Sequence, residues 1–320
     1  MVTVKKVGGI ILVHYRLFLL GAIVIAASAV IQDPFQNIIN VFLLQVPYIA
    51  IYAFGMTLAI LVGGLDLSQG GIAAFSTCVG AMFIIRGGLV DTILGILICI
   101  AIGAVFGLLN GIIITKAKVP PFIATYGMEW SVRGLSYIMM GGAMIFGFTD
   151  GFRDIARGSI LGISNVSVIA IVILVVLLFV TLKTTFGRNI YMVGANPQAA
   201  KLSGVNNDFV ITMVFMISGA LGSTAGILYV SRLNTAEVFL GTEFALTALA
   251  ASLIGGTRQG GGVGGVINTI QGVMILMFVF NLLNVWRVSV LWHPLAFGVI
   301  IVFAALLEKA RTAYLVKRLQ

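Results

Sequence analysis

Glu129 and Arg133 are two charged residues inside one long apolar segment, residues 122–140. A spacing of four places both side chains on one face of a helix, with the acid toward the amino end. Charges in a membrane-spanning helix are costly and normally face a partner or a water-filled path. The spacing therefore predicts either an ion pair that holds neighbouring helices together or charged groups that line a solute path.

Further polar residues interrupt the apolar segments. In 62–71 (VGGLDLSQGG), Asp66 and Ser68 could cap a helix that starts near Gly71, or they could line a gate. The other polar candidates are amide side chains, each of which fits a helix-to-helix hydrogen bond better than a ligand contact. They are Asn110, Asn268, Gln271, Asn281 and Asn284. Of these, Asn110, Asn268 and Gln271 join Asp66 and Ser68 as candidates for a solute path.

The residue types of an active site do not gather in this sequence. It has no HExxH motif, no cluster of His and Cys, and no carboxylates at a catalytic spacing, so neither a catalytic centre nor a metal site is predicted. The glycine-rich run 255–265 (GGTRQGGGVGG) lacks the pattern of a phosphate-binding loop, which favours a flexible turn. Cys78 and Cys99 lie in apolar runs, as small buried residues do. We expect a chain that is not an enzyme and carries no cofactor of its own.

The composition indicates an all-α protein that crosses a membrane several times. Hydrophobic residues make up 60% of the chain and charged residues 9%, and the mean hydropathy is +1.14. Soluble domains carry about 25% charged residues, so these charges could not cover a soluble surface. The net charge of +9 comes from short basic clusters at the ends of apolar runs, not from a basic stripe interleaved with aromatics. Membrane lipid is therefore the expected surroundings, and nucleic acid is not an expected partner.

A helix needs about 20 apolar residues to cross the hydrocarbon core. On this basis we predict about ten spans within a single transmembrane domain, residues 1–320, with a retained first span and no cleaved signal peptide. The third and eighth spans are short, and Pro47 and the glycines predict kinks and close helix contacts. The spans cover residues 11–31, 41–62, 72–85, 92–114, 122–140, 160–182, 209–230, 244–253, 266–285 and 290–307.

The distribution of Lys and Arg orients these spans. With the amino terminus in the cytosol, most basic residues fall on the inner side, as the positive-inside rule requires. Both termini and the loop 183–208 are then cytoplasmic, and the loop 141–159 is periplasmic. The segments 41–140 and 209–307 would each cross four times in opposite senses, which predicts a possible inverted four-helix repeat.

The loop 183–208 (KTTFGRNIYMVGANPQAAKLSGVNND) is more patterned than a plain connector. Asn196-Pro197 is typical of a helix start, and Gly204 is a natural stop. The pattern predicts a short amphipathic helix outside the bilayer, to which a cytosolic partner could bind.

Five segments, in order along nearly the whole chain, resemble the permease family of carbohydrate-type ABC importers, which includes ribose, galactose, xylose and autoinducer-2 permeases. They are GGLDLSQGG (63–71), GLLNGIIITKAKVPPFIATYG (107–127), Arg133-Gly134, FGRNIYMVGANPQAAKLSGVN (186–206) and LIGGTRQGGGVGGVINTIQG (253–272). The sequence departs from the family pattern at Gln69-Gly70, at 258–262 and at Glu129.

The resemblance implies a fold and a set of partners. Two permease subunits, identical or paralogous, would form the pathway in the cytoplasmic membrane of a prokaryote. Cytosolic ATPase subunits, which bind ATP and Mg, would drive transport, and a periplasmic or lipid-anchored binding protein would deliver a sugar or sugar-like solute. By resemblance, the residues that couple to the ATPase would be Gly187, Arg188, Gly194, Asn196, Pro197, Ala199, Ala200 and Gly204.

Two further expectations concern the outer loop and the class of transporter. The stretch 150–157 alternates in charge, so Arg153 and Arg157 are candidates for docking the binding protein. The alternative function is a stand-alone secondary transporter or facilitator of small polar solutes. Such a protein would work without an ATPase. The loop 183–208 argues against this alternative, because a facilitator needs no patterned cytosolic loop.

Overall fold

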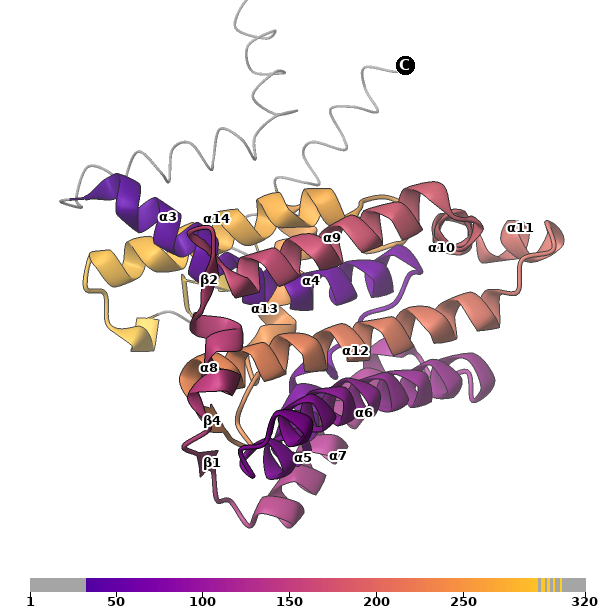
Figure 1. Cartoon of the computed structure of the whole chain (residues 1–320). Helices are drawn as coiled ribbons and strands as arrows, with labels where there is room; N and C mark the ends of the chain where they lie inside the picture. The colour runs from indigo at the N-terminus through magenta and orange to yellow at the C-terminus, as the bar shows by residue number, and fades with distance from the viewer. Residues whose placement is uncertain (1–32, 293–294, 297, 300–301, 303–305, 307–320) are drawn as a thin grey trace, which may run out of the picture.

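The computed structural model describes residues 33–292, 295–296, 298–299, 302 and 306. Helices dominate this part of the chain, which confirms the all-α prediction (Figure 1). The first predicted span, residues 11–31, and half of the tenth, 290–307, lie outside the described residues. Of the tenth, the structure places a short 3-10 helix, η1, at Val290–Trp292.

In the part of the chain that the structure describes, four helices are long and apolar enough to cross a membrane, which confirms a multi-pass protein. They are α6 (Leu89–Lys116), α9 (Asn165–Lys183), α12 (Asn207–Leu233) and α14 (Val266–Val285). A bent pair, α3 (Pro34–Leu44) and α4 (Val46–Leu61), makes a fifth candidate. The two helices meet at 41°, beside Pro47, whose ring and missing N–H interrupt a helix. The predicted kink is confirmed.

The remaining predicted spans are shorter or more polar. The third is α5 (Gln69–Ile84), the fifth is α7 (Pro121–Met140), and the eighth is α13 (Phe244–Ile254), which has only 11 residues. The sixth span begins at Asn165, so our prediction of residue 160 was wrong. Residues 159–164 instead form a hairpin, because Leu161 and Gly162 both have positive φ, as a two-residue hairpin turn requires.

Three layers make up the bundle (Figure 1). The helix α12 lies in the middle, with α5, α6 and α7 on one side and α4, α9 and α14 on the other. All sixteen residues of α4 are buried, so this helix is enclosed by protein instead of lipid. The two sides and α12 thus enclose the core of the molecule.

Glycines bring α6 and α12 into backbone contact. A Cβ added at Gly103 would overlap Ser223, one at Gly107 would overlap the Phe215 carbonyl, and one at Gly111 would lie 2.5 Å from the Thr212 Cα. The three glycines recur every four residues on one face of α6, as in small-xxx-small contacts between membrane helices. The close helix contacts predicted from the glycine content are confirmed here.

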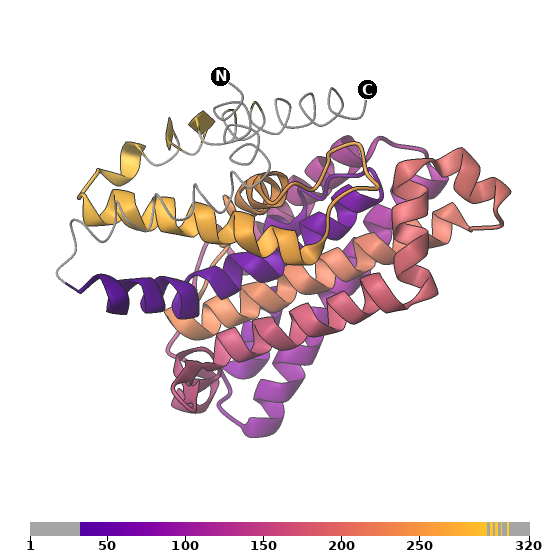
Figure 2. The ribbon, with the colours of Figure 1, turned by 90° about the horizontal axis from the view of Figure 1, so that it is seen from above.

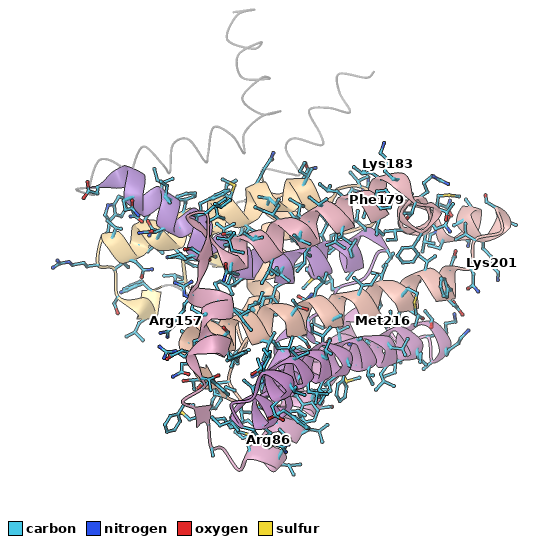
Figure 3. The ribbon with its side chains drawn as sticks, in the orientation of Figure 1. Arg86, Arg157, Phe179, Lys183, Lys201 and Met216 are labelled. Atoms are coloured by element: carbon cyan, nitrogen blue, oxygen red, sulfur yellow. The ribbon has the colours of Figure 1, made fainter. Side chains whose placement is uncertain are left out.

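The two ends of the bundle differ. At one end, which we call the Lys201 end, α10 (Thr185–Ala195) and α11 (Pro197–Leu202) project beyond the other helices (Figure 2). The opposite, Arg157 end carries α8 (Asp150–Arg157) and two short antiparallel ladders. These pair β1 (Ile145–Phe146) with β4 (Thr235–Ala236) and β2 (Ser159–Ile160) with β3 (Ile163–Ser164). Figure 3 shows Lys183 and Lys201 at the first end and Arg157 at the second. The inverted repeat stays a prediction.

Candidate functional site

The loop 183–208 folds into two helices. The Asn196 side chain caps α11 by accepting hydrogen bonds from the backbone N–H groups of Gln198 and Ala199, both at 3.0 Å. Pro197 occupies the first turn, and Gly204 follows the helix with φ +83°. The predicted helix start and stop are therefore confirmed, because both depend on local chemistry.

Sequence reasoning missed the helix α10. The Thr184 side chain caps it by accepting a hydrogen bond from the Gly187 backbone N–H at 3.1 Å. Phe186, Ile190 and Val193 recur at helical spacing, and the last two are fully buried. That spacing is a signal that could have predicted the helix.

The eight predicted coupling residues fall into two groups. Gly187, Gly194 and Ala200 are buried against the rest of the bundle, whereas the other five are exposed. The exposed residues are Arg188, Asn196, Pro197, Ala199 and Gly204. Beside them Leu202 is 91% exposed, an apolar side chain at the tip of the projection. The segment thus has a buried base and an exposed tip.

At its buried base, α10 meets two glycine-rich turns. A Cβ on Gly194 would overlap the Leu61 carbonyl and lie 2.6 Å from the backbone nitrogen of Gly262. Gly262 in turn donates a hydrogen bond of 3.0 Å to the Leu61 carbonyl. The turns after α4 and α13 therefore lie together at the base of α10. We call this contact of Gly194, Leu61 and Gly262 the glycine junction.

Tyr191 adds a side-chain contact to the glycine junction. Its hydroxyl donates a hydrogen bond of 3.2 Å to the Gly264 carbonyl. Burial raises the pKa of Tyr191 above its ordinary value, so the hydroxyl stays protonated and remains a donor. The base of α10 is thus joined to the 255–265 loop by both backbone packing and a hydrogen bond.

Three of the predicted path residues form one buried cluster. The Ser68 hydroxyl donates to an Asp66 carboxylate oxygen at 2.5 Å, and the Asn110 amide donates to the Ser68 hydroxyl at 2.8 Å. All three are fully buried. The capping prediction was wrong: α5 begins at Gln69, and neither side chain caps it, because Ser68 bonds to Asp66 instead.

Glu129 and Arg133 form the predicted ion pair, with the Nη2 and Oε1 atoms 2.6 Å apart. Arg133 also donates to the carbonyls of Val238, at 2.5 Å, and Leu240, while Glu129 accepts from the Gly71 backbone N–H. Both charged side chains are buried. The pair thus ties α7 to the start of α5 and to the segment before α13, and a role in a solute path stays a prediction.

The other predicted polar residues lie apart from these clusters. Asn268 and Gln271 are half-buried on α14, and within the described chain no hydrogen bond joins their side chains to the five residues above. Asn281 exchanges two hydrogen bonds, of 3.2 and 3.1 Å, with Asn37 of α3. That pair is the helix-to-helix contact predicted for such residues.

The predicted docking arginines lie on α8. Arg153 pairs with Asp150 at 2.7 Å, and the Arg157 guanidinium donates two hydrogen bonds, of 2.9 and 2.7 Å, to the Arg232 carbonyl at the end of α12. Arg157 therefore attaches α8 to the bundle, while the Asp150 side chain is 87% exposed. Docking of the binding protein by Arg153 and Arg157 stays a prediction.

Comparison with known proteins assigns the chain to a family. The model of the family described as "Branched-chain amino acid transport system / permease component" matches residues 38–305. The ribose import permease protein RbsC of Bacillus subtilis (strain 168) is 40% identical over 300 residues, 93% of this chain and 92% of the relative. The galactose/methyl galactoside import permease protein MglC of Escherichia coli (strain K12) is 34% identical over 97% of this chain and 96% of its own.

The D-allose transport system permease protein AlsC of Escherichia coli (strain K12) is 31% identical over 92% of this chain and 91% of its own. No solved structure matches the chain. The resemblance inferred from the five motifs is confirmed by these matches, which are to transport permeases and not to enzymes. The chain therefore belongs to the family of the branched-chain amino acid transport system permease component.

Proposed function

We propose that this chain is the membrane-spanning permease subunit of an ATP-binding-cassette importer for a sugar or sugar-like solute. The names of the relatives, which are ribose, galactose/methyl galactoside and D-allose permeases, support the solute class. One observation carries the coupling to an ATPase: the α10–α11 projection has an exposed tip and a base packed on the glycine junction. Such a projection can receive a movement at one end and deliver it at the other.

The exposed tip is the part that docks on a separate cytosolic ATPase, which binds ATP and Mg. Leu202 supplies an apolar contact, and the exposed Arg188 of α10 and Lys201 of α11 supply positive charge on the same projection. An apolar centre with a charged rim is the usual anatomy of a protein interface. Gly187, Gly194 and Ala200 are buried, so they act by holding the projection against the bundle.

The buried base transmits the movement. When the ATPase subunits close, α11 and α10 shift together, and Gly194 presses on the Leu61 carbonyl at the end of α4. The same carbonyl holds the Gly262 N–H of the loop between α13 and α14. A shift of α10 therefore reaches three helices of the bundle through one backbone contact.

The remaining parts of the assembly follow from this orientation. The chain lies in the cytoplasmic membrane of a prokaryote, with both termini and residues 183–208 in the cytosol. The excess of Lys and Arg on the inner side of the predicted spans supports this orientation through the positive-inside rule. Residues 141–159 are periplasmic, and α8, with Arg153 and Arg157, faces a periplasmic or lipid-anchored binding protein. A second permease subunit completes the pathway.

The solute path passes near the buried polar groups of the bundle. Asp66 and Ser68 lie just before α5, Asn110 lies on α6 and the Glu129–Arg133 pair on α7. Asn268 and Gln271 lie on α14. Buried charges and amides inside a membrane domain are costly, and they typically mark a transport path. The ion pair would hold the helices on one side of that path.

Binding of the ATPase tests the proposal. We would replace Leu202 by Asp and measure how much ATPase subunit copurifies with the permease and how much solute the reconstituted complex imports with ATP. We expect a loss of both. Leu161→Asp is the matched control, because Leu161 is 98% exposed on the hairpin at the other end. ATPase binding that Leu202→Asp leaves unchanged would show that the tip is not the docking surface, whereas uptake by the purified chain without any ATPase would support a stand-alone facilitator.

A further inference from the structure

A cavity of about 420 Å³ lies at the Arg157 end of the bundle. Residues from the start of α4, the end of α12, the start of α13 and the end of α14 line it. Its volume falls within the range of about 300–1,000 Å³ that is usual for small-molecule sites. None of the seven path residues predicted from the sequence lines it, so it is a separate candidate site.

Three aromatic side chains form one wall of the cavity. Tyr229 contacts both Tyr48 and Phe244 edge to face, with ring centroids 5.7 and 5.1 Å apart. Such contacts hold the rings in fixed orientations. The faces of aromatic rings carry negative potential, so they attract polarised C–H groups. The wall is therefore rigid, apolar and suited to the C–H face of a small ring.

Polar side chains without protein partners complete the lining. Gln45, Glu243 and Asn284 border the cavity, and in the part of the chain that the structure describes their side chains make no hydrogen bond or ion pair. Two amides supply donors and acceptors, and the carboxylate supplies further acceptors. These three side chains can therefore bind several hydroxyl groups of one ligand.

The charge balance of the cavity favours a neutral ligand. Arg232 is committed to the protein, since its guanidinium donates to the Leu44 carbonyl and lies 5.4 Å from the Tyr48 ring centroid. Glu243 would oppose an anion, and Arg232 would oppose a cation. A lipid chain would leave the two amides and the carboxylate without hydrogen-bond partners, which is costly.

We propose that this cavity is the first site in the permease at which the solute binds, and that it takes a neutral aldose in ring form. The ring's C–H face lies on Tyr48, Tyr229 and Phe244, and its hydroxyl groups bond to Gln45, Glu243 and Asn284. The site rests on the proposed import of a sugar, and it adds a location and a mode of recognition.

Cysteine labelling tests the site directly. The chain has two cysteines, Cys78 and Cys99, and both are fully buried. We would label Leu233→Cys, which lines the cavity, is 49% exposed and is not one of the sugar-binding side chains, in the permease–ATPase complex with a water-soluble methanethiosulfonate, with and without D-ribose, D-galactose or D-allose. At least one aldose should slow the labelling in a saturable manner, and open-chain mannitol should not. Ser289→Cys, exposed just beyond α14, is the control, and its labelling should not respond to sugar.

Transport kinetics provide a second measurement. Glu243→Gln replaces a charged hydrogen-bond acceptor by a neutral one, which should weaken the affinity for the sugar about tenfold. The apparent KM for ATP-driven uptake should therefore rise about tenfold, while kcat stays constant. Labelling that no aldose slows, or that mannitol slows equally, would overturn the site. Uptake that continues without the ATPase would instead overturn the proposed function, so the two failures are distinguishable.

Discussion

Replacing Gly194 by Ala is the most direct perturbation of the glycine junction. The new Cβ would overlap the Leu61 carbonyl oxygen and lie 2.6 Å from the Gly262 nitrogen. Both are backbone atoms, so no side-chain rotation can relieve the overlap. Inserting a methyl group into a well-packed site costs about 1–3 kcal/mol. We expect about 2–3 kcal/mol, because α10 must move away from α4 and strain the Gly262–Leu61 hydrogen bond as well.

Two measurements test the effect of Gly194→Ala. The midpoint of thermal unfolding of the purified permease should fall, and the amount of solute imported per ATP hydrolysed by the reconstituted complex should fall as well. ATP hydrolysis itself should continue, because the exposed tip of α11 is unaltered. Gly134→Ala is the matched control, since its Cβ would meet no atom of the described residues within 4 Å. At such a helical site, Ala is neutral or stabilises by about 0.4–1 kcal/mol.

The reasoning would be refuted if Gly194→Ala kept both the wild-type unfolding midpoint and the wild-type ratio of solute to ATP. A lower midpoint with an unchanged ratio would show that the glycine junction stabilises the fold but does not transmit movement. Only a fall in both supports the proposed route from α10 to α4.

The remaining predictions concern a helix cap, an ion pair and a hydroxyl cluster. Asn196→Ala removes two capping hydrogen bonds and should destabilise α11 by about 0.5–2 kcal/mol, which amide hydrogen exchange of α11 would show as a faster rate. Asn196→Asp should keep the cap and the slower exchange. Equal exchange rates in the two variants would contradict the capping role. Arg133→Met leaves Glu129 buried without its partner and should cost about 3–5 kcal/mol in unfolding. Adding Glu129→Gln should restore part of that loss, and strictly additive effects would contradict the pairing. Thr57→Val removes the hydroxyl that joins α4 to α13 and α14, and it should lower the free energy of unfolding by about 0.6–2 kcal/mol. Thr57→Ser keeps the hydroxyl and should leave that free energy unchanged. An equal loss in both variants would argue against a stabilising role of these hydrogen bonds.

The features predictable from the sequence were those decided by neighbours in the chain. Asn196 and Pro197 predict a helix start through contacts with residues no more than three positions away, and the structure shows the Asn196 side chain capping α11. Glu129 and Arg133 are one helical turn apart, so their pairing follows once the segment is helical. Long apolar segments likewise predicted α6, α9, α12 and α14.

The features that escaped prediction depend on residues far apart in the chain. Ser68 was expected to cap α5, but a bond to Asp66 and a donor from Asn110, 42 residues away, fix its hydroxyl elsewhere. The contact of Gly194 with Gly262 joins the helix α10 to a turn, and hydropathy alone describes both segments only as loops. The aromatic cavity is lined by residues from four helices, and no sequence motif in any of these helices predicts a cavity.

The glycine stripe between α6 and α12 has a consequence for how the domain can deform. Gly103, Gly107 and Gly111 meet backbone atoms and the small side chains of Ser223 and Thr212 on α12, so little side-chain volume lies between the two helices that could adopt a second packing. The pair must therefore travel as one rigid body. Bending is left to the connections at its margins, residues 117–120 and 203–206, where the chain leaves helical geometry. An inward or outward opening of this permease would thus be a rotation of other helices around a stiff central slab.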